Sequence, residues 1–178
     1  MTIQTERLTL RPVRPRDVKP TLAYSRDPEN AAYMPSLPLL KKRETMQYCM
    51  WFMLNICKQW KKKSRRRYDF AVVLDGKHIG AVSVLPDKKN HRRGELTWII
   101  QKAHWGKGYA TEAAKAAMDF ALQELEVDCL HAKCDYRNDA SRRVMEKIGL
   151  LPEPDCNAAW RCKGSNEWTK VLIYSLTI

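Results

Sequence analysis

The sequence lacks a long apolar run and an apolar leader, although 44% of its 178 residues are hydrophobic. Its most apolar stretch, Met46–Trp60, is interrupted by Gln47, Asn55, Lys58 and Gln59, and it is shorter than the roughly 20 residues that span a bilayer. The first residues contain no apolar core of a signal peptide. We therefore expect a cytoplasmic protein with no membrane partner, built as a single domain over residues 1–178.

Cysteine pairs at metal-binding spacing are also missing. The six cysteines contain no C-x-x-C motif and are few for a disulfide scaffold of this length, so we expect reduced thiols. They are Cys49, Cys57, Cys129, Cys134, Cys156 and Cys162. His131 lies between Cys129 and Cys134, but on a strand Cys134 would point to the opposite face from the other two. The sequence therefore predicts no metal site.

Acidic residues are scarce relative to basic ones: 20 Asp and Glu stand against 32 Lys and Arg, which gives a net charge of +12. The excess is concentrated in two runs, residues 61–67 and 88–93. Such runs are common in solvated loops, and they also steer proteins toward RNA, the ribosome or another acidic partner. No stacking aromatic residues interleave with them, and the sequence leaves both interpretations open.

Glycine is rare as well, yet two of the seven glycines fall in one short segment, residues 105–111. Without a Cβ, Gly106 and Gly108 allow a sharp turn and a close approach of the backbone to a ligand. The segment leads into an alanine-rich helical pattern, whose first N–H groups and dipole favour an anion. An ordinary turn into a helix is the alternative.

The glycine segment matches neither of two common nucleotide-binding loops. A P-loop needs four residues between its first glycine and a Gly-Lys-Ser/Thr triplet, and the glycine segment has no such arrangement. A dinucleotide fingerprint needs a small residue at the position of Thr111 and an acidic residue at the end of the next strand. Here the acidic residue, Asp128, stands at the beginning of that strand, so this fingerprint does not match either. A diphosphate held by backbone amides alone remains, and coenzyme A carries such a diphosphate.

Hydrophobic periodicity predicts an α+β layer fold, with a three-stranded antiparallel meander followed by β-α-β-α-β-β. The expected strands cover residues 7–13, 70–74, 78–85, 95–101, 129–135, 158–162 and 168–176, with Asp75-Gly76 as a hairpin turn. The expected helices are one with Asp17 near its start, one over residues 46–60, one from the glycine segment to about Leu125, and one over residues 139–148 that Gly149 ends.

Four segments together resemble the GNAT N-acetyltransferase superfamily, and specifically its ribosomal-protein N-acetyltransferase-like branch. They are residues 5–12 (TERLTLRP), 94–100 (GELTWII), 105–113 (WGKGYATEA) and 138–150 (NDASRRVMEKIGL). Trp105 is typical of that branch, whereas Lys102 replaces its usual proline. The resemblance implies a GNAT-like fold, in which a central mixed, mostly antiparallel twisted sheet has splayed strands and flanking helices.

The resemblance also implies that acetyl-CoA is a co-substrate bound where two neighbouring parallel strands, residues 95–101 and 129–135, splay apart. Backbone amides of the glycine segment would hold its diphosphate: Trp105, Gly106, Lys107, Gly108, Tyr109, Ala110 and Thr111. The backbone of Ile100 would hold the pantetheine or the thioester carbonyl, and Asn138 would hold the pantetheine arm.

Acetyl transfer to an amine needs a proton acceptor, because a free alkylamine has a pKa near about 10. We expect Glu95 to take this proton directly or through water, while a surface or salt-bridged glutamate is the alternative. Many superfamily members protonate the leaving thiolate with a tyrosine where Met145 stands here. Ser141 is the substitute we expect and Tyr136 the second candidate, although a serine often bonds its own backbone instead.

The sequence thus predicts an acetyl-CoA-dependent N-acetyltransferase that acts on a primary amine, either a protein N-terminus or a small molecule, by direct attack in a ternary complex. The alternative is a CoA-binding module without catalysis, whose basic face binds RNA or the ribosome. Either protein could be a monomer or a homodimer.

Overall fold

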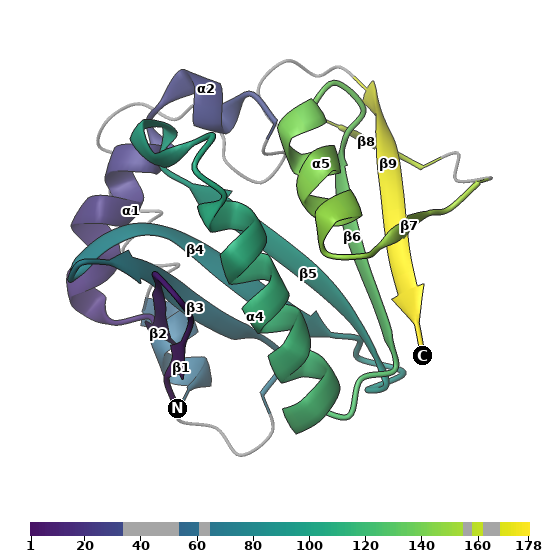
Figure 1. Cartoon of the computed structure of the whole chain (residues 1–178), viewed down its shortest axis with the longest axis horizontal. Helices are drawn as coiled ribbons and strands as arrows, with labels where there is room; N and C mark the ends of the chain where they lie inside the picture. The colour runs from purple at the N-terminus through teal and green to yellow at the C-terminus, as the bar shows by residue number, and fades with distance from the viewer. Residues whose placement is uncertain (34–53, 61–64, 155–157, 162–167) are drawn as a thin grey trace.

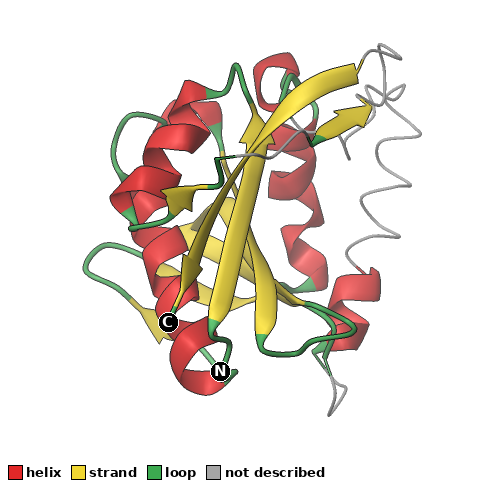
Figure 2. Ribbon diagram, turned by 90° about the vertical axis from the view of Figure 1, so that its right-hand side faces the viewer, coloured by secondary structure: helices red, strands yellow, loops and turns green. Residues whose placement is uncertain are grey.

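A computed structural model describes residues 1–33, 54–60, 65–154, 158–161 and 168–178. Within these ranges the chain forms a mixed sheet in the order β1-β2-β3-β4-β5-β6-β9-β7, with β8 paired to β9 (Figure 1). The strands are β1 (Ile3–Gln4), β2 (Thr9–Pro12), β3 (Tyr68–Leu74), β4 (Lys77–Pro86), β5 (Arg93–Ile100), β6 (Cys129–Asp135), β7 (Leu151–Pro152), β8 (Ala159–Arg161) and β9 (Trp168–Thr177). Figure 2 shows helices on both sides of this sheet.

The described helices are η1 (Pro15–Asp17), α1 (Val18–Ser25), α2 (Pro28–Ala31), η2 (Lys102–His104), α4 (Tyr109–Glu124) and α5 (Asp139–Lys147). Residues 54–59 are also helical. Residues 46–53 of the helix expected over residues 46–60 lie outside the described residues, and Trp60 is a turn rather than the end of the helix. The last residue of the strand expected over 158–162 also lies outside the described residues. In the part of the chain that the structure covers, no helix is long and apolar enough to cross a membrane.

The meander from β3 to β5 is antiparallel throughout, as the sequence predicted. Its first turn places Asp75 (φ 48°) and Gly76 (φ 75°) in the left-handed region. Two consecutive left-handed residues match the twist of a tight hairpin. The turn sets the pairing of Leu74 with Lys77 and Val73 with His78, and an irregularity between Val72 and Val73 then shifts the register by one residue, so that Asp69 lies opposite Ser83.

The strands β5 and β6 are parallel, and they pair only over Arg93–Glu95 and Cys129–His131. Beyond the last of these pairs, Glu95 with His131, β5 continues to pair with β4 up to Ile100, while β6 continues to pair with β9 up to Asp135. The two strands therefore diverge toward their carboxyl ends. This confirms the splayed sheet that the sequence resemblance implied.

One face of the sheet is covered by α4, with α5 beside it (Figure 1). The helix α4 buries a row of small side chains completely: Ala113, Ala114, Ala117 and Ala121. Small side chains let the helix backbone lie close to the strands, so this face carries the main core with Leu96, Ile100 and Leu130. This packing holds the first turn of α4 next to the open end of β5.

The opposite face is divided between a small core and a polar region. Val13, Ala71 and Val73 form the small core with Ile56 from the helical residues 54–59, and Val18 of α1 packs against it. On β5 and β6 this face instead carries Glu95 and other partly exposed polar side chains. A ligand approaching the splayed strands from this side would meet polar groups.

Three sequence predictions need correction. The strand expected over residues 7–13 covers only Thr9–Pro12. The strands β1 and β7 were not predicted, because two residues each are too short to show a periodicity. Both lie at the sheet's outer positions and are held by pairing with β2 and β9, which the sequence pattern alone does not reveal.

Candidate active site

The glycine segment forms an open loop before α4. Gly106 and Gly108 have φ values of 73° and 82°, and Gly108 is the N-cap residue of the helix. A Cβ added to Gly106 would meet no atom within 4 Å. The loop therefore has the backbone conformation that favours glycine, and space for a ligand on the side where a side chain would project.

The amides of this loop are largely unused. The Trp105 N–H donates to the Lys102 carbonyl (3.0 Å), so this amide is not available to a ligand as the loop stands. From Gly106 to Thr111, no backbone N–H has a hydrogen-bond acceptor among the described residues. These amides and the positive end of the α4 dipole fit the diphosphate of acetyl-CoA.

Trp105 fastens the loop to β5 through its side chain. Its indole Nε1–H donates to the Ile100 carbonyl (2.7 Å), so that carbonyl is occupied. The bond from Gln101 N–H to Ile79 O (2.8 Å) indicates that odd-numbered residues of β5 bond to β4. The amide of Ile100 therefore points toward the splay, and it is the group that Ile100 can offer to a pantetheine arm.

Asn138 and Ser141 begin α5. Asn138 is the N-cap residue, and its Oδ1 accepts the Ser141 N–H (3.0 Å), so one of its two polar side-chain atoms is used inside the helix. The Ser141 side chain lies near the buried thiol of Cys134 on β6 and acts to lower the pKa of that thiol. Burial raises the pKa of Cys134 to about 11. Ser141 thus lies on the inner side of α5, close to the open end of β6.

Tyr136 follows β6 directly and is 52% exposed. The guanidinium of Arg137 lies over its ring at 5.6 Å and also bonds the fully buried carboxylate of Asp135 (2.7 Å). Thr169 on β9 donates to the same carboxylate (3.0 Å). The end of β6 is therefore a firmly held polar corner with one exposed aromatic ring.

Glu95 lies on the last rung before the splay, directly opposite His131. Its Oε2 is 3.1 Å from Lys133 Nζ and 3.5 Å from His131 Nε2. The bond to His131 and the charge of Lys133 outweigh burial and hold the pKa of Glu95 below its ordinary value. Glu95 is thus a partly buried, charged carboxylate paired with two cationic or proton-carrying groups.

Sequence analysis did not identify His131 and Lys133 as partners of Glu95. Their spacing of two does put both side chains on one face of a strand. Their distance from Glu95, however, depends on the register between β5 and β6, for which the sequence carries no readable signal. His131 and Cys134 lie on opposite faces of β6, and no group of three potential metal ligands occurs among the residues that the structure describes.

Comparison with known proteins identifies the class. Residues 7–151 match the acetyltransferase (GNAT) domain family. The chain therefore belongs to this family, and its relatives support an N-acetyltransferase.

Two relatives illustrate the range of the family. The chain is 30% identical over 153 residues to the uncharacterized protein YkkB of Bacillus subtilis, a match that covers 82% of this chain and 83% of the relative. It is 36% identical over 91 residues to the spermidine N(1)-acetyltransferase of Escherichia coli, a match that covers 51% of this chain and 48% of that enzyme.

Solved structures share the fold at lower identity. The microcin C7 self-immunity acetyltransferase MccE, in complex with acetyl-CoA and AMP, has a TM-score of 0.81 at 15% identity over 98% of this chain and 94% of its own. The ribosomal L7/L12 α-N-protein acetyltransferase RimL, in complex with coenzyme A, has a TM-score of 0.75 at 14% identity over 100% and 98%. Structural neighbours in the family thus bind acetyl-CoA or CoA.

Proposed function

We propose that this protein transfers an acetyl group from acetyl-CoA to a primary amine by direct attack in a ternary complex. The observation that carries the proposal is the divergence of β5 and β6 immediately after the Glu95–His131 rung, with a loop of free amides at the open end. A single domain over residues 1–178 accounts for all of these groups, and we propose that it acts as a monomer or a homodimer.

Acetyl-CoA supplies an acetyl thioester, and the chain has to hold it. The amides from Gly106 to Thr111 would bind the diphosphate at the N-terminus of α4. The Ile100 N–H would bind the pantetheine or the thioester carbonyl. The free amide group of Asn138 would bind the pantetheine arm near the start of α5.

Glu95 would receive the proton of the attacking amine. A carboxylate whose pKa is lowered is a weak base, so it would hold the proton only briefly and release it to solvent. A carboxylate also attracts and orients an ammonium group, and Lys133 already presents one at 3.1 Å. We therefore assign Glu95 to binding the amine and accepting its proton, directly or through a water molecule.

Protonation of the departing thiolate falls to Ser141 in this proposal, with Tyr136 as the second candidate. Ser141 is partly buried at the start of α5, near Cys134 and the open end of β6. Tyr136 is exposed at the same end.

The acceptor is a primary amine of either of two kinds. A relative of this chain is a spermidine N(1)-acetyltransferase, and a structural neighbour is a ribosomal L7/L12 α-N-protein acetyltransferase. A small polyamine and a protein N-terminus share the amine group that Glu95 would bind.

A second candidate function is a CoA-binding module that contacts RNA or the ribosome without catalysis. The observation in its favour is the convergence of two basic segments, residues 65–67 and 88–93, at one end of the sheet. The pairing of Tyr68 with Val84 brings the start of β3 beside the end of β4, so both segments leave the sheet there.

Two measurements on one preparation separate these functions. Calorimetric titration with CoA tests cofactor binding, and a thiol-reactive dye tests release of free CoA from acetyl-CoA in the presence of polyamines, amino acid amides and N-terminal peptides. Amine-dependent thiol release supports the enzyme. CoA binding without thiol release for any amine supports the module, and the absence of CoA binding would sink both.

A further inference from the structure

We infer that Arg7 is a positioning residue for the diphosphate loop, which it clamps to the carboxylate of Glu112. The inference rests on the proposed function, because it concerns the loop that would bind the diphosphate of acetyl-CoA. Arg7 lies in the segment before β2, about one hundred residues away in sequence from the loop that it contacts.

The backbone and the side chain of Arg7 both bond Glu112. The Arg7 N–H donates to Glu112 Oε1 (2.8 Å), and the guanidinium Nε donates to Glu112 Oε2 (2.7 Å). The guanidinium Nη1 donates in addition to the Lys107 carbonyl (3.0 Å). One arginine therefore connects the first turn of α4 to the loop that precedes it.

The same guanidinium contacts the two residues that follow Lys107. It lies over the Tyr109 ring at 4.7 Å, and a Cβ added to Gly108 would be 3.3 Å from its Nη2. Arg7 thus lies against three consecutive residues around the left-handed Gly108. These contacts restrain the loop conformation in which the amides from Gly106 to Thr111 have no acceptor among the described residues.

Glu112 needs such a partner because of its position. A carboxylate in the first turn of α4 is favoured by the helix dipole, yet a free one would repel a diphosphate at the same helix end. Thr5 Oγ1 donates to Glu112 Oε1 (2.6 Å), and together Thr5 and Arg7 hold the side chain at 15% exposure. The clamp therefore neutralises a negative charge that would compete with the ligand.

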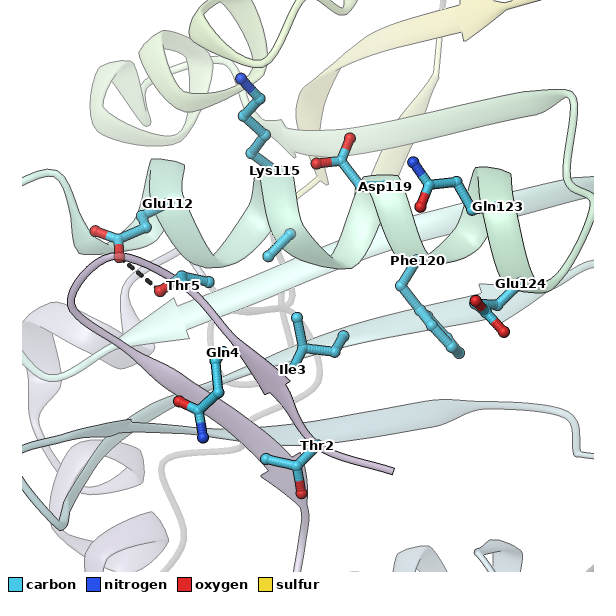
Figure 3. Close-up of a pocket in the computed structure, with 11 residues that line it drawn as sticks. Thr2, Ile3, Gln4, Thr5, Glu112, Lys115, Asp119, Phe120, Gln123 and Glu124 are labelled. Atoms are coloured by element: carbon cyan, nitrogen blue, oxygen red, sulfur yellow. Dashed lines mark hydrogen bonds between the residues drawn. The ribbon is translucent and has the colours of Figure 1, made fainter.

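The clamp reaches the loop from the side away from α5. Figure 3 shows the bond between Thr5 and Glu112 at one end of a groove of about 600 Å³ between β1 and α4. In Figure 1 these N-terminal strands and α5 lie on opposite sides of α4. Arg7 therefore does not occupy the side of the loop toward α5, where Asn138 lies and where the pantetheine arm would bind.

Titration calorimetry with CoA tests the clamp directly. We expect Arg7→Ala to weaken CoA binding roughly tenfold, since several charge-assisted hydrogen bonds are lost. The matched control is Arg16→Ala, which removes the same charge from an exposed arginine of η1 that makes no contact with the loop among the described residues. Wild-type affinity in Arg7→Ala would overturn the inference, whereas failure of the wild-type protein to bind CoA would overturn the proposed function.

The conservative variant separates a clamp from a simple charge effect. In Arg7→Lys a single ammonium cannot span Glu112 and the Lys107 carbonyl together. We therefore expect this variant to bind CoA several-fold more weakly than the wild type. Full affinity in Arg7→Lys would show that only the positive charge matters and would overturn the clamp.

A shortened co-substrate provides the readout that a merely structural role would not give. Acetyl-pantetheine carries the thioester but no diphosphate. We expect Arg7→Ala to raise the KM for acetyl-CoA, to leave the KM for the amine unchanged, and to leave kcat/KM with acetyl-pantetheine unchanged. Equal losses with both thioesters would overturn the inference.

Discussion

At the scale of single residues, charge pairing decides which groups are ready to react. Glu95 is held by Lys133 and His131 on the rung where the sheet opens, and its pKa is lowered chiefly by the bond to His131. The arrangement supports a carboxylate that stays ionised at neutral pH. It is also what an ordinary salt-bridged glutamate would show, so the two roles have to be separated by kinetics.

The first prediction concerns Glu95. We expect Glu95→Gln to lower kcat by about 10² with little change in the Kd for CoA, because the amide cannot accept a proton. The loss should shrink as pH rises, since more of the amine is then already neutral. Steady-state rates between pH 6.5 and 9.5 check this.

Lys133→Gln is the matched control for that prediction, because it removes the same ion pair from the other side. A purely structural pair predicts similar small losses of melting temperature and near wild-type rates in both variants. That result would rule out a role for Glu95 in proton transfer.

The second prediction concerns a buried histidine at the start of β4. The His78 ring lies between Tyr24, Asp17 and the Gly80 carbonyl, with Arg11 nearby. Burial lowers its pKa below the ordinary value despite the attraction of Asp17 and the bond to Gly80. When pH falls below about 6.5, the unfolded chain therefore takes up a proton before the folded chain does.

The free energy of unfolding should accordingly decrease as pH falls from about 7 toward the lowered pKa of His78. We expect His78→Gln to flatten this part of the profile, measured as melting temperature against pH between 7.5 and 5. An unchanged slope in the variant would show that other groups cause the acid sensitivity.

At the scale of elements, the strongest periodic patterns were sufficient to predict where helices and strands lie and which of their faces are buried. The strand Cys129–Asp135 has the predicted bounds, and the start of α5 and its end near Gly149 agree with their capping residues. The alanine face of α4 is buried as its spacing indicated. In each case a local pattern reports directly on burial.

What could not be predicted depends on contacts between distant segments. The free amides of the loop follow from its glycines and could be anticipated from sequence. Three side-chain contacts depend on tertiary packing. They are the bond from Trp105 to the Ile100 carbonyl, the bond from Lys133 to Glu95, and the bonds from Arg7 to Glu112. No local signal in the sequence encodes these distances.

The third prediction belongs to the loop as an element. We expect Gly108→Val to abolish the increase in melting temperature that CoA produces, because a β-branched residue disfavours φ 82° and its Cβ would lie 3.3 Å from Arg7 Nη2. Thermal melts with and without CoA check this.

Gly76→Val is the control for the loop variant. Gly76 also has a positive φ (75°), but it lies in the β3–β4 hairpin, where an added Cβ would have nothing within 4 Å. The substitution should lower stability through the same backbone strain and leave the CoA shift intact. Loss of the shift in both variants would mean that strain, and not the loop, accounts for the effect.

At the scale of the whole molecule, the basic segments and the loop proposed to bind the diphosphate lie at opposite ends of the sheet. The strand β5 begins at Arg93 in the basic segment and ends at Ile100 beside the diphosphate loop. At about 3.3 Å per residue, these ends are roughly 23 Å apart. A polyanion bound at the basic end would therefore leave the cofactor loop accessible.

The last prediction tests whether the basic end binds nucleic acid. Arg66, Lys88 and Lys89 are exposed, and no ion pair is recorded for them among the described residues. If they contact phosphates, the wild-type protein should bind single-stranded RNA with an affinity that falls steeply with salt. Replacing all three with serine should then reduce the slope of log K against log salt by about 2, since each phosphate contact contributes about 0.7. Fluorescence anisotropy at several salt concentrations measures the slope, and calorimetry should find CoA binding unchanged. An unchanged slope, or no RNA binding by the wild type at low salt, would show that these residues form a solvated surface, and the acetyltransferase would then have no need of a nucleic-acid partner at this end.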